Sequence, residues 1–276
     1  MPEHRVDRRQ RLTNVVRSVL DTSSADYIVA VTMVRNERDI VSATVAHLLA
    51  QGVDLVVVAD NNSTDGTAQS IDHLVDSGRV VVVSDRVEAF DQGLKLTRLS
   101  RWATANGASW VVPFDADEFY FGAPDETLRD TLLNSRHGVL CADVFEYVPS
   151  AAAIEDQHRS WSAADLVTRR SAAQALPKVV FRANYLARLS GGNHKVSHPE
   201  PTESGLRIAH LPVRNFDQMR RKYLEGARAL EAAEIPSGVG RHWSKRAALS
   251  DDQLREMLRR EFVGSDEVVE DPIVDW

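Results

Sequence analysis

Short runs of β-branched residues alternate with stretches of helical periodicity from residue 27 onward, and this alternation most restricts the fold. Alternating strands and helices are typical of a parallel sheet covered by helices. The run at 55–59 is apolar throughout, as expected for a strand buried on both faces. We therefore predict an α/β fold with a mainly parallel sheet. Its strands lie at 27–34, 55–59, 80–84, 110–114, 138–148, 178–182 and 206–209, and its helices at 40–51, 92–105, 216–234 and from 250 onward.

Polar clusters follow three of the predicted strands. They occupy residues 35–38, 60–67 and 115–118. Because the carboxyl ends of parallel strands meet at one edge of a sheet, these clusters should converge on one ligand crevice. Residues 36–39 can also cap the first helix, and residues 63–65 the helix after the second strand.

Asp115 and Asp117 flank one small residue directly after the fourth strand. Neighbouring carboxylates repel each other unless protons or a cation compensate their charge. Magnesium and manganese bind carboxylate oxygens together with substrate phosphates. The pair therefore predicts a divalent-cation site, while a solvated acidic turn is the alternative.

Read in order, the clusters are R-N-E, D-N-x-S-T-D-G-T and D-A-D-E. With these motifs the sequence resembles the family 2 glycosyltransferases with the GT-A fold, closely over residues 27–122 and loosely beyond. The resemblance implies transfer of a sugar from a nucleoside-diphosphate sugar, with a UDP-sugar expected, assisted by Mn2+ or Mg2+. It also implies inversion at the sugar. The acceptor would be a carbohydrate, a lipid-linked sugar or a small molecule.

The resemblance also implies which residues bind the donor. Asp60 would hydrogen-bond the base with Asn61 beside it, although the family usually has D-D-G-S where this chain has D-N-N-S. Gly93 and Arg98 match the glycine and arginine of the family's third helix, which places Arg98 near the nucleotide. A solvated helical face is the alternative for Lys95 and Arg98. Thr32, Arg35 and Glu37 would lie along the nucleoside. Asp115 would lie at the diphosphate.

A histidine from the C-terminal half often completes the metal site in such enzymes, and His210 is our candidate because it ends a predicted strand. A histidine that only bonds a neighbour is the alternative. His194 lies in a glycine-rich turn that can approach the donor or acceptor closely. The catalytic residues are expected among Asp117, His194 and three candidates for the base that deprotonates the acceptor, Glu118, Asp143 and Glu146. Asp143 and Glu146 should point to opposite faces of one strand.

The simplest organisation is one domain with a C-terminal extension. Residues 1–24 would form an amphipathic helix, 25–122 the nucleotide-sugar half, 123–214 the acceptor half and 215–276 a helical extension. The N-terminal helix is expected to dock on the domain or to touch a membrane surface. A net charge of -7 argues against nucleic acid as a partner. A single cysteine and no apolar run of membrane-spanning length favour the cytoplasm.

Two other function classes fit parts of the pattern. A sugar-phosphate nucleotidyltransferase shares the topology but should have a glycine-rich loop after the first strand, where this chain has residues 34–37. A non-catalytic nucleotide-sugar-binding protein would keep the crevice and lack the base.

Overall fold

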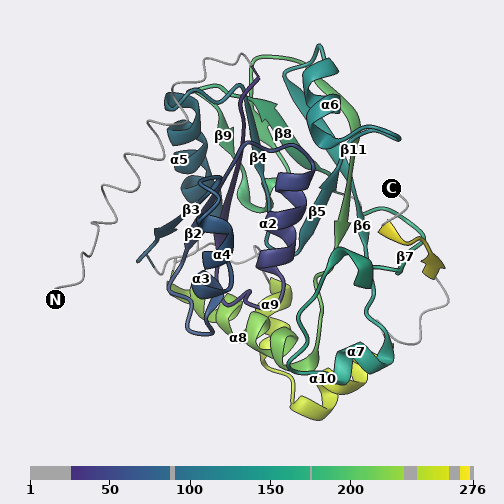
Figure 1. The fold of residues 1–276 in the computed structure, drawn as a ribbon. Coiled ribbons are helices and arrows are strands. Elements are labelled where there is room, and N and C mark those ends of the chain that lie inside the picture. The colour runs from purple at the N-terminus through teal and green to yellow at the C-terminus, as the bar shows by residue number, and fades with distance from the viewer. Residues whose placement is uncertain (1–25, 88–90, 175, 233–240, 261–267, 274–276) are drawn as a thin grey trace, which may run out of the picture.

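The computed structural model of the chain describes residues 26–87, 91–174, 176–232, 241–260 and 268–273 (Figure 1). The predicted N-terminal helix at 1–24 lies outside these residues.

The described part of the chain contains one large sheet of eight strands, in the order β3-β2-β1-β4-β8-β6-β11-β5. Helices cover both of its faces, so the predicted α/β fold with a mainly parallel sheet is confirmed. The strands are β1 (Ile28–Val34), β2 (Leu55–Asp60), β3 (Val80–Ser84), β4 (Trp110–Pro113), β5 (Glu118–Phe121), β6 (Val139–Glu146), β8 (Lys178–Arg182) and β11 (Thr202–His210).

Strand direction determines which residues share the carboxyl edge. β1 to β4 are mutually parallel, and β6 is parallel to β11. β8 runs antiparallel to β4 and β6, and β5 runs antiparallel to β11. The edge where six strands end is therefore the edge where β5 and β8 begin, so Glu118 and Lys178 lie there too. The short strand β5, which the sequence analysis did not predict, carries Glu118 opposite His210.

Two apolar layers hold the helices on the sheet. On one face, α2 (Val41–Ala50) and α6 (Leu128–Asn134) bury Val45, Leu48 and Leu132 against the strands. On the other face, α5 (Gln92–Ala105) buries Leu96 and Ala103. Full burial of aliphatic side chains on both faces is the main stabilising contribution to such a sheet.

Caps decide where the helices begin. Asp91 accepts a hydrogen bond from the backbone of Leu94, and α5 starts at the predicted residue. The predicted cap of α2 is wrong, because its N-cap is Ile40, which makes no side-chain cap bond. The polar side chains before Ile40 bond to other loops instead.

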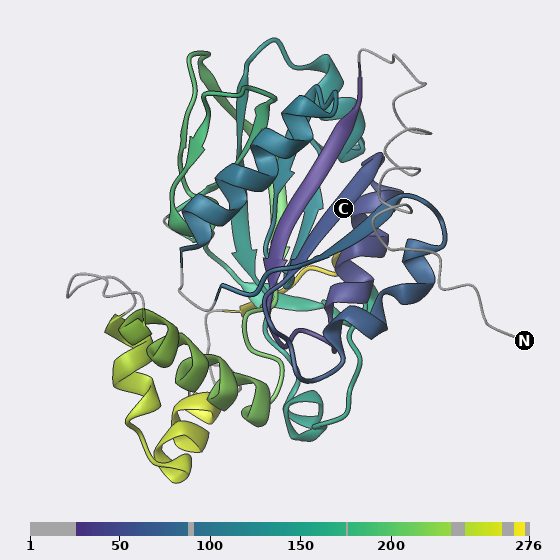
Figure 2. The same ribbon diagram turned by 90° about the vertical axis from the view of Figure 1, so that its left-hand side faces the viewer.

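Three helices near the C-terminus lie beyond the carboxyl edge of the sheet (Figure 2). They are α8 (Phe216–Ala232), α9 (Arg241–Ala247) and α10 (Asp251–Leu258). Phe216, Met219, Tyr223 and Leu254 form their shared apolar core with Val213 from the chain leaving β11. Asn215 caps α8 by accepting the backbone N–H of Gln218 at 2.8 Å, as predicted. This packing brings one face of α8 to the sheet edge.

The remaining elements are short. Within the described ranges, no helix is long and apolar enough to cross a membrane. The short helices are α3 (Thr67–Ser70), α4 (Asp72–Val75), α7 (Ala151–Glu155), η1 (Ala163–Asp165) and η2 (Gly191–Asn193), and the short strands are β7 (Thr168–Arg170), β9 (Arg188–Leu189), β10 (Val196–Ser197) and β13 (Val268–Glu270).

Candidate active site

The loops after β1 and β2 are held together by their own polar groups. The backbone N–H of Asn36 donates to Ser63 Oγ at 3.0 Å, and Asn36 Oδ1 accepts the backbone N–H of Thr64 at 2.8 Å. Asn36 adopts a φ of 57°, a left-handed conformation that asparagine tolerates better than most residues. The R-N-E and D-N-x-S-T-D-G-T motifs therefore form one interlocked pair of loops.

Asp65 and Thr67 add further hydrogen bonds between the same two loops. The backbone N–H of Glu37 donates to Thr67 Oγ1 at 2.9 Å, and that of Arg38 donates to Asp65 Oδ2 at 3.2 Å. Asp65 also accepts the backbone N–H of Thr67, whereas Ser63 and Thr64 bond to Asn36. The N-cap of α3 is Gly66, with no side-chain cap bond, so the capping prediction for residues 63–65 is wrong.

Asp60 and Asn61 form hydrogen bonds within their own loop and to the segment after β3. Asp60 Oδ1 accepts the backbone N–H of Ser63 at 3.3 Å. Asn61 is almost buried and donates to the Asp85 carboxylate at 2.9 Å and to the Val87 carbonyl at 2.7 Å. Lys95 pairs with the same Asp85 carboxylate at 2.7 Å, so it holds this loop and is not simply a solvated residue. The expected base contact of Asp60 and Asn61 stays a prediction.

Three further residues that were expected to bind the donor, Thr32, Gly93 and Arg98, lie in different surroundings. Thr32 is fully buried on the strand face of Ala30 and Val34, and its hydroxyl has no hydrogen-bond partner among the described residues, so its expected place along the nucleoside stays a prediction. A Cβ on Gly93 would lie 2.9 Å from the Leu189 carbonyl oxygen, so this glycine permits close packing of α5 on β9. Arg98 is exposed further along α5, and its nucleotide contact remains a prediction.

Asp115 is bound on the α5 and β8 side of the site. Its Oδ1 accepts Gln92 Nε2 at 2.8 Å and Asn193 Nδ2 at 3.4 Å, and its Oδ2 pairs with Lys178 Nζ at 2.7 Å. Lys178 is nearly buried and also pairs with Glu118 at 2.7 Å. Burial alone would lower the pKa of Lys178, but Asp115 and Glu118 raise it above its ordinary value. Lys178 is therefore a permanent cation between two carboxylates.

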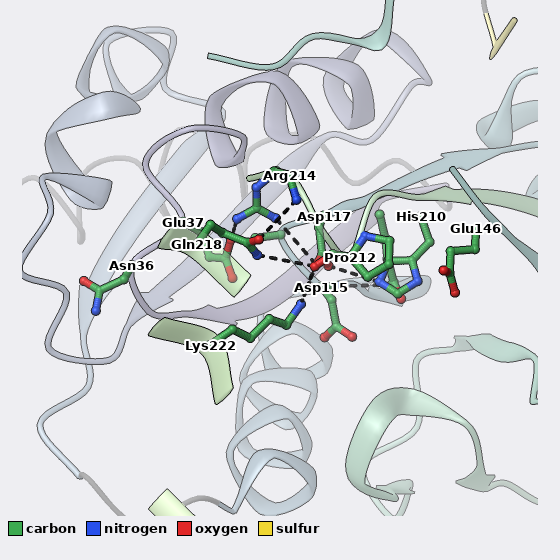
Figure 3. Close-up of polar contacts among 12 residues, drawn as sticks. Asn36, Glu37, Asp115, Asp117, Glu146, His210, Pro212, Arg214, Gln218 and Lys222 are labelled. Atoms are coloured by element: carbon green, nitrogen blue, oxygen red, sulfur yellow. Dashed lines mark hydrogen bonds and ion pairs between the residues drawn. The ribbon is translucent and has the colours of Figure 1, made fainter. Parts of the chain in front are cut away.

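Asp117 is bound on the α8 side, and Figure 3 shows its partners converging on it. Its Oδ2 accepts Lys222 Nζ at 2.9 Å and lies 3.7 Å from Arg214 Nη1, while its Oδ1 lies 3.6 Å from His210 Nε2. Burial alone would raise the pKa of Asp117, but Lys222, His210 and Arg214 hold it well below its ordinary value. The charge compensation predicted for the aspartate pair is thus supplied here by side-chain cations.

Arg214 connects Asp117 to the loop after β1. Its guanidinium is fully buried, donates from Nε to Asp39 Oδ2 at 2.6 Å and makes a short contact with Glu37. Burial raises the pKa of Glu37, while Arg214 opposes that rise. Glu37 is therefore connected to Asp117 through Arg214, which contacts both carboxylates. Its expected position along the nucleoside is not tested by this contact.

Arg35 and Asn36 contact α8 directly. Arg35 Nε lies 3.6 Å from Glu225, and Asn36 Nδ2 donates to the same carboxylate at 2.7 Å. Arg221 on α8 donates to the Asn36 carbonyl at 3.1 Å. The loop that the resemblance places along the nucleoside is thus clamped by a helix almost 190 residues away in sequence.

His210 ends β11 beside Glu146 of β6, as their strand register requires. Gln174 Nε2 lies 3.1 Å from His210 Nδ1 and 3.5 Å from Glu146 Oε2. Arg170 Nε donates to Glu146 Oε1 at 3.1 Å. The structure therefore brings His210 to Asp117, as expected for a residue at a strand end, and places Glu146 beside His210.

The other catalytic candidates are less well placed. Glu118 is fully buried, and burial raises its pKa against the opposing effect of Lys178. Asp143 is exposed on the face of β6 opposite to Glu146, which confirms the predicted alternation. His194 lies half-buried with its Nδ1 3.0 Å from the Pro177 carbonyl oxygen, and burial lowers its pKa.

The predicted metal set of Asp115, Asp117 and His210 is only partly assembled. In the described part of the chain, no three His, Cys, Asp or Glu side chains are grouped as a metal site. Asp115 faces Lys178, whereas Asp117 Oδ1 and His210 Nε2 face each other at 3.6 Å. Two ligand atoms at that separation fit one ion with bonds of about 2.1 Å. Asp117 and His210 are therefore the residues that could hold a divalent cation.

Several site residues escaped the sequence analysis. Lys178 begins a strand whose three middle residues are apolar, and Gln218, Lys222 and Glu225 repeat at helical spacing on α8, so a polar-face signal existed. Nothing in the linear sequence assigned these residues to one aspartate or the other. The full set is Gln92, Arg170, Gln174, Lys178, Asn193, Arg214, Lys222 and Glu225.

Comparison with known proteins identifies the family. The sequence matches the description "Glycosyl transferase family 2" over residues 29–189, more than half of the chain. The chain belongs to glycosyl transferase family 2. The match starts in β1 and ends in β9, so it includes both motif loops, Asp115 and Asp117. It ends before His210, Arg214 and Lys222.

Solved structures of several glycosyltransferases are similar to this family 2 protein. S. aureus TarS 1–349 with UDP-GlcNAc is 13% identical, with a TM-score of 0.43 over 85% of this chain and 71% of that one. Glucosyl-3-phosphoglycerate synthase from Mycobacterium tuberculosis, with Mn2+ and UDP, is 18% identical, with a TM-score of 0.32 over 48% of each chain. GalNAc-T7 is 11% identical, with a TM-score of 0.39 over 95% of this chain and 66% of that one. No curated protein matches.

Proposed function

We propose that this glycosyltransferase takes its sugar from a nucleoside-diphosphate sugar, with a UDP-sugar expected, and uses Mn2+ or Mg2+. The observation that carries the proposal is the charged cluster around Asp117 and His210, directly beside the interlocked loops. Family membership supports a sugar donor, and the cluster supports a diphosphate with a cation.

The donor diphosphate would lie at the carboxyl edge between the motif loops and the basic side chains. Lys178, Arg214 and Lys222 all reach this edge, from β8, the chain after β11 and α8. Ammonium and guanidinium groups are strong hydrogen-bond donors to phosphate oxygens. A divalent cation would supply the further positive charge that the neighbouring carboxylates require. The nucleoside would then extend over the loops that contain Asp60 and Arg35.

Asp117 and His210 would hold the cation. For His210 Nε2 to bind it, Nδ1 must carry the ring proton, so the Gln174 amide would turn its oxygen toward Nδ1 and thereby orient the ring. A bound divalent ion supplies positive charge that stabilises a departing diphosphate. Asp115 would act beside them through Gln92 and Lys178, which hold its carboxylate in place. The chain's own cations balance the remaining negative charge.

Of the three candidates for the base, Glu146 is favoured by position. It lies at the carboxyl edge beside His210, and its ion pair with Arg170 keeps its carboxylate oriented. A carboxylate there can accept the proton of an acceptor hydroxyl while the sugar is inverted. Glu118 is enclosed with Lys178, and Asp143 lies away from the edge. The acceptor stays within the predicted classes of carbohydrate, lipid-linked sugar or small molecule.

Family membership decides between the competing enzyme readings. It favours sugar transfer over nucleotidyl transfer, in agreement with the absence of a glycine-rich loop at residues 34–37. A glycosyltransferase should release nucleoside diphosphate, whereas a nucleotidyltransferase should release pyrophosphate from a nucleoside triphosphate.

A donor panel tests the proposal. The protein is incubated with UDP-, GDP- and dTDP-sugars with and without Mn2+, and nucleotide release and thermal stability are followed. We expect one donor class to raise the melting temperature and to release nucleoside diphosphate slowly, in a metal-dependent manner. If no sugar nucleotide changes the melting temperature, the proposed function is wrong.

Glu146→Gln tests the assignment of the base. The variant should bind the donor normally and lose transfer, and loss of donor binding would exclude Glu146 as the base.

A further inference from the structure

The cations around Asp117 differ in how firmly they are held. Arg214 has no exposed side-chain surface and is fixed by Glu37 and Asp39. His210 is fixed by its strand and by Gln174. Asp117 itself is nearly buried, so each cation beside it strongly affects what else can bind there.

Lys222 is the cation that can leave. About a third of its side chain (34%) is exposed, and its other hydrogen bond, to the Pro212 carbonyl, is long at 3.4 Å. A lysine ammonium sits on a flexible four-carbon stem and is readily rehydrated. Figure 3 shows Lys222 reaching Asp117 from α8, on the side opposite to His210.

The single negative charge of Asp117 cannot balance both the charge of a divalent ion and that of the Lys222 ammonium. An ion held by Asp117 and His210 would place two further positive charges close to the Lys222 ammonium, which lies 2.9 Å from Asp117 Oδ2. Like charges at such distances disfavour each other. Since Arg214 is enclosed, Lys222 is the group that gives way.

α8 keeps the displaced lysine near the donor. Glu225 and Arg221 attach α8 to Asn36 in the loop after β1, on either side of Lys222 in the helix sequence. The Lys222 backbone therefore stays at the sheet edge when its ammonium leaves Asp117. The anionic group expected there is the donor diphosphate, so this step rests on the proposed function.

We propose that Lys222 is an exchangeable counter-ion, paired with Asp117 in the empty protein and transferred to the donor diphosphate when a divalent ion takes Asp117. The exchange makes metal and donor binding depend on each other. Lys222 opposes the metal when it binds alone and favours the nucleotide once the metal is present.

Lys222→Gln separates these two effects because it has opposite consequences in two titrations. In calorimetry with Mn2+ alone, the dissociation constant should fall about tenfold, as expected when a modest repulsion between nearby charges is removed. In saturating Mn2+, the dissociation constant of UDP should rise about tenfold. The free-Mn2+ signal in electron paramagnetic resonance gives an independent measure of metal binding.

Lys245→Gln is the matched control, because it removes the same charge from an exposed position on α9. It should change neither titration. Lys222→Arg keeps the charge and should leave the Mn2+ affinity close to that of the wild type. Thermal unfolding of each variant shows that the fold is retained.

Unchanged or weaker Mn2+ binding by Lys222→Gln overturns the exchange, and so does unchanged UDP binding. If the wild type still releases nucleoside diphosphate from a sugar nucleotide in either case, only the exchange is wrong. If neither protein binds any sugar nucleotide, with or without Mn2+, the proposed function fails as well.

Discussion

Two parts of the carboxyl edge are built in different ways. The motif loops after β1 and β2 are joined mainly by hydrogen bonds of backbone groups to Asn36, Ser63 and Asp65. The α8 side joins charged groups, with Arg214 and Lys222 placed around Asp117. The first part uses residues about 30 apart in sequence, and the second uses residues about 100 apart.

The difference shows where each part takes its stability from. Hydrogen bonds of neutral groups each contribute modestly, and the loss of one is tolerated. Buried charges are different, because removing one partner leaves the others uncompensated in a medium that solvates them poorly. We therefore expect the α8 side to be sensitive to single substitutions and the motif loops to be tolerant.

The largest effect is expected for Arg214→Met. Its removal leaves Glu37, Asp39 and Asp117 without their shared cation, and breaking such a buried pair costs about 3–5 kcal/mol. Chemical denaturation measures the loss. Arg220→Met is the control, because its pair with the exposed Asp251 should contribute less than about 1 kcal/mol. Equal losses in the two variants would remove the basis of the comparison.

Asp117→Asn should abolish measurable Mn2+ binding, a loss of more than about 100-fold, because it removes a ligand and not only a supporting contact. It should also lower the melting temperature, since Lys222 and Arg214 lose their partner. Asp115→Asn is the comparison, and it should retain most of the Mn2+ affinity because Asp115 is bound to Lys178. Calorimetry of both variants decides, and a greater loss for Asp115→Asn would reverse our ligand assignment.

His210→Ala should weaken Mn2+ binding about 10- to 100-fold, less than Asp117→Asn, because the negatively charged ligand Asp117 remains. The fold should be retained because β11 keeps its backbone pairing. His194→Ala, at the histidine bonded to the Pro177 carbonyl, should leave the Mn2+ affinity unchanged. Unaltered binding by His210→Ala would leave His210 with a structural role alone.

The smallest effect is expected for Ser63→Ala in the motif loops. It removes one hydrogen bond to the Asn36 backbone, which contributes about 0.5–1.5 kcal/mol. Mn2+ affinity should not change, and thermal unfolding should show a small decrease in melting temperature. A loss as large as that of Arg214→Met would show that the loops are as critical as the charged side.

Much of the fold was predictable because its signals are local. The bounds of β3, β8 and α5 follow from apolar runs, helical spacing and the cap at Asp91. β5 was missed because its four residues continue directly from the D-A-D-E motif, and a short apolar run after a turn has no periodicity of its own. The predicted side-chain cap of α2 is absent because the polar side chains before the helix bond to distant parts of the chain.

The site was predictable only in part. Strand order along the chain placed Asp60, Asp115, Asp117 and His210 at strand ends, and the topology brought those ends to one edge. The motif position of Thr32 did not reveal that its side chain is fully buried in the sheet. Sequence spacing also gave no means of finding that Arg214, in the chain after β11, pairs with Glu37 and Asp39 in the loop after β1.

The sequence by itself determined the alternation of strands and helices, the family, and the polar clusters that follow the strands, because these depend on neighbouring residues. The tertiary structure decided which cation faces which aspartate. Lys178 reaches Asp115 across 63 residues, and Lys222 reaches Asp117 across 105. Such pairs form only after the sheet and α8 have packed, because a charge is stabilised by what surrounds it in space and not by its neighbours in the chain.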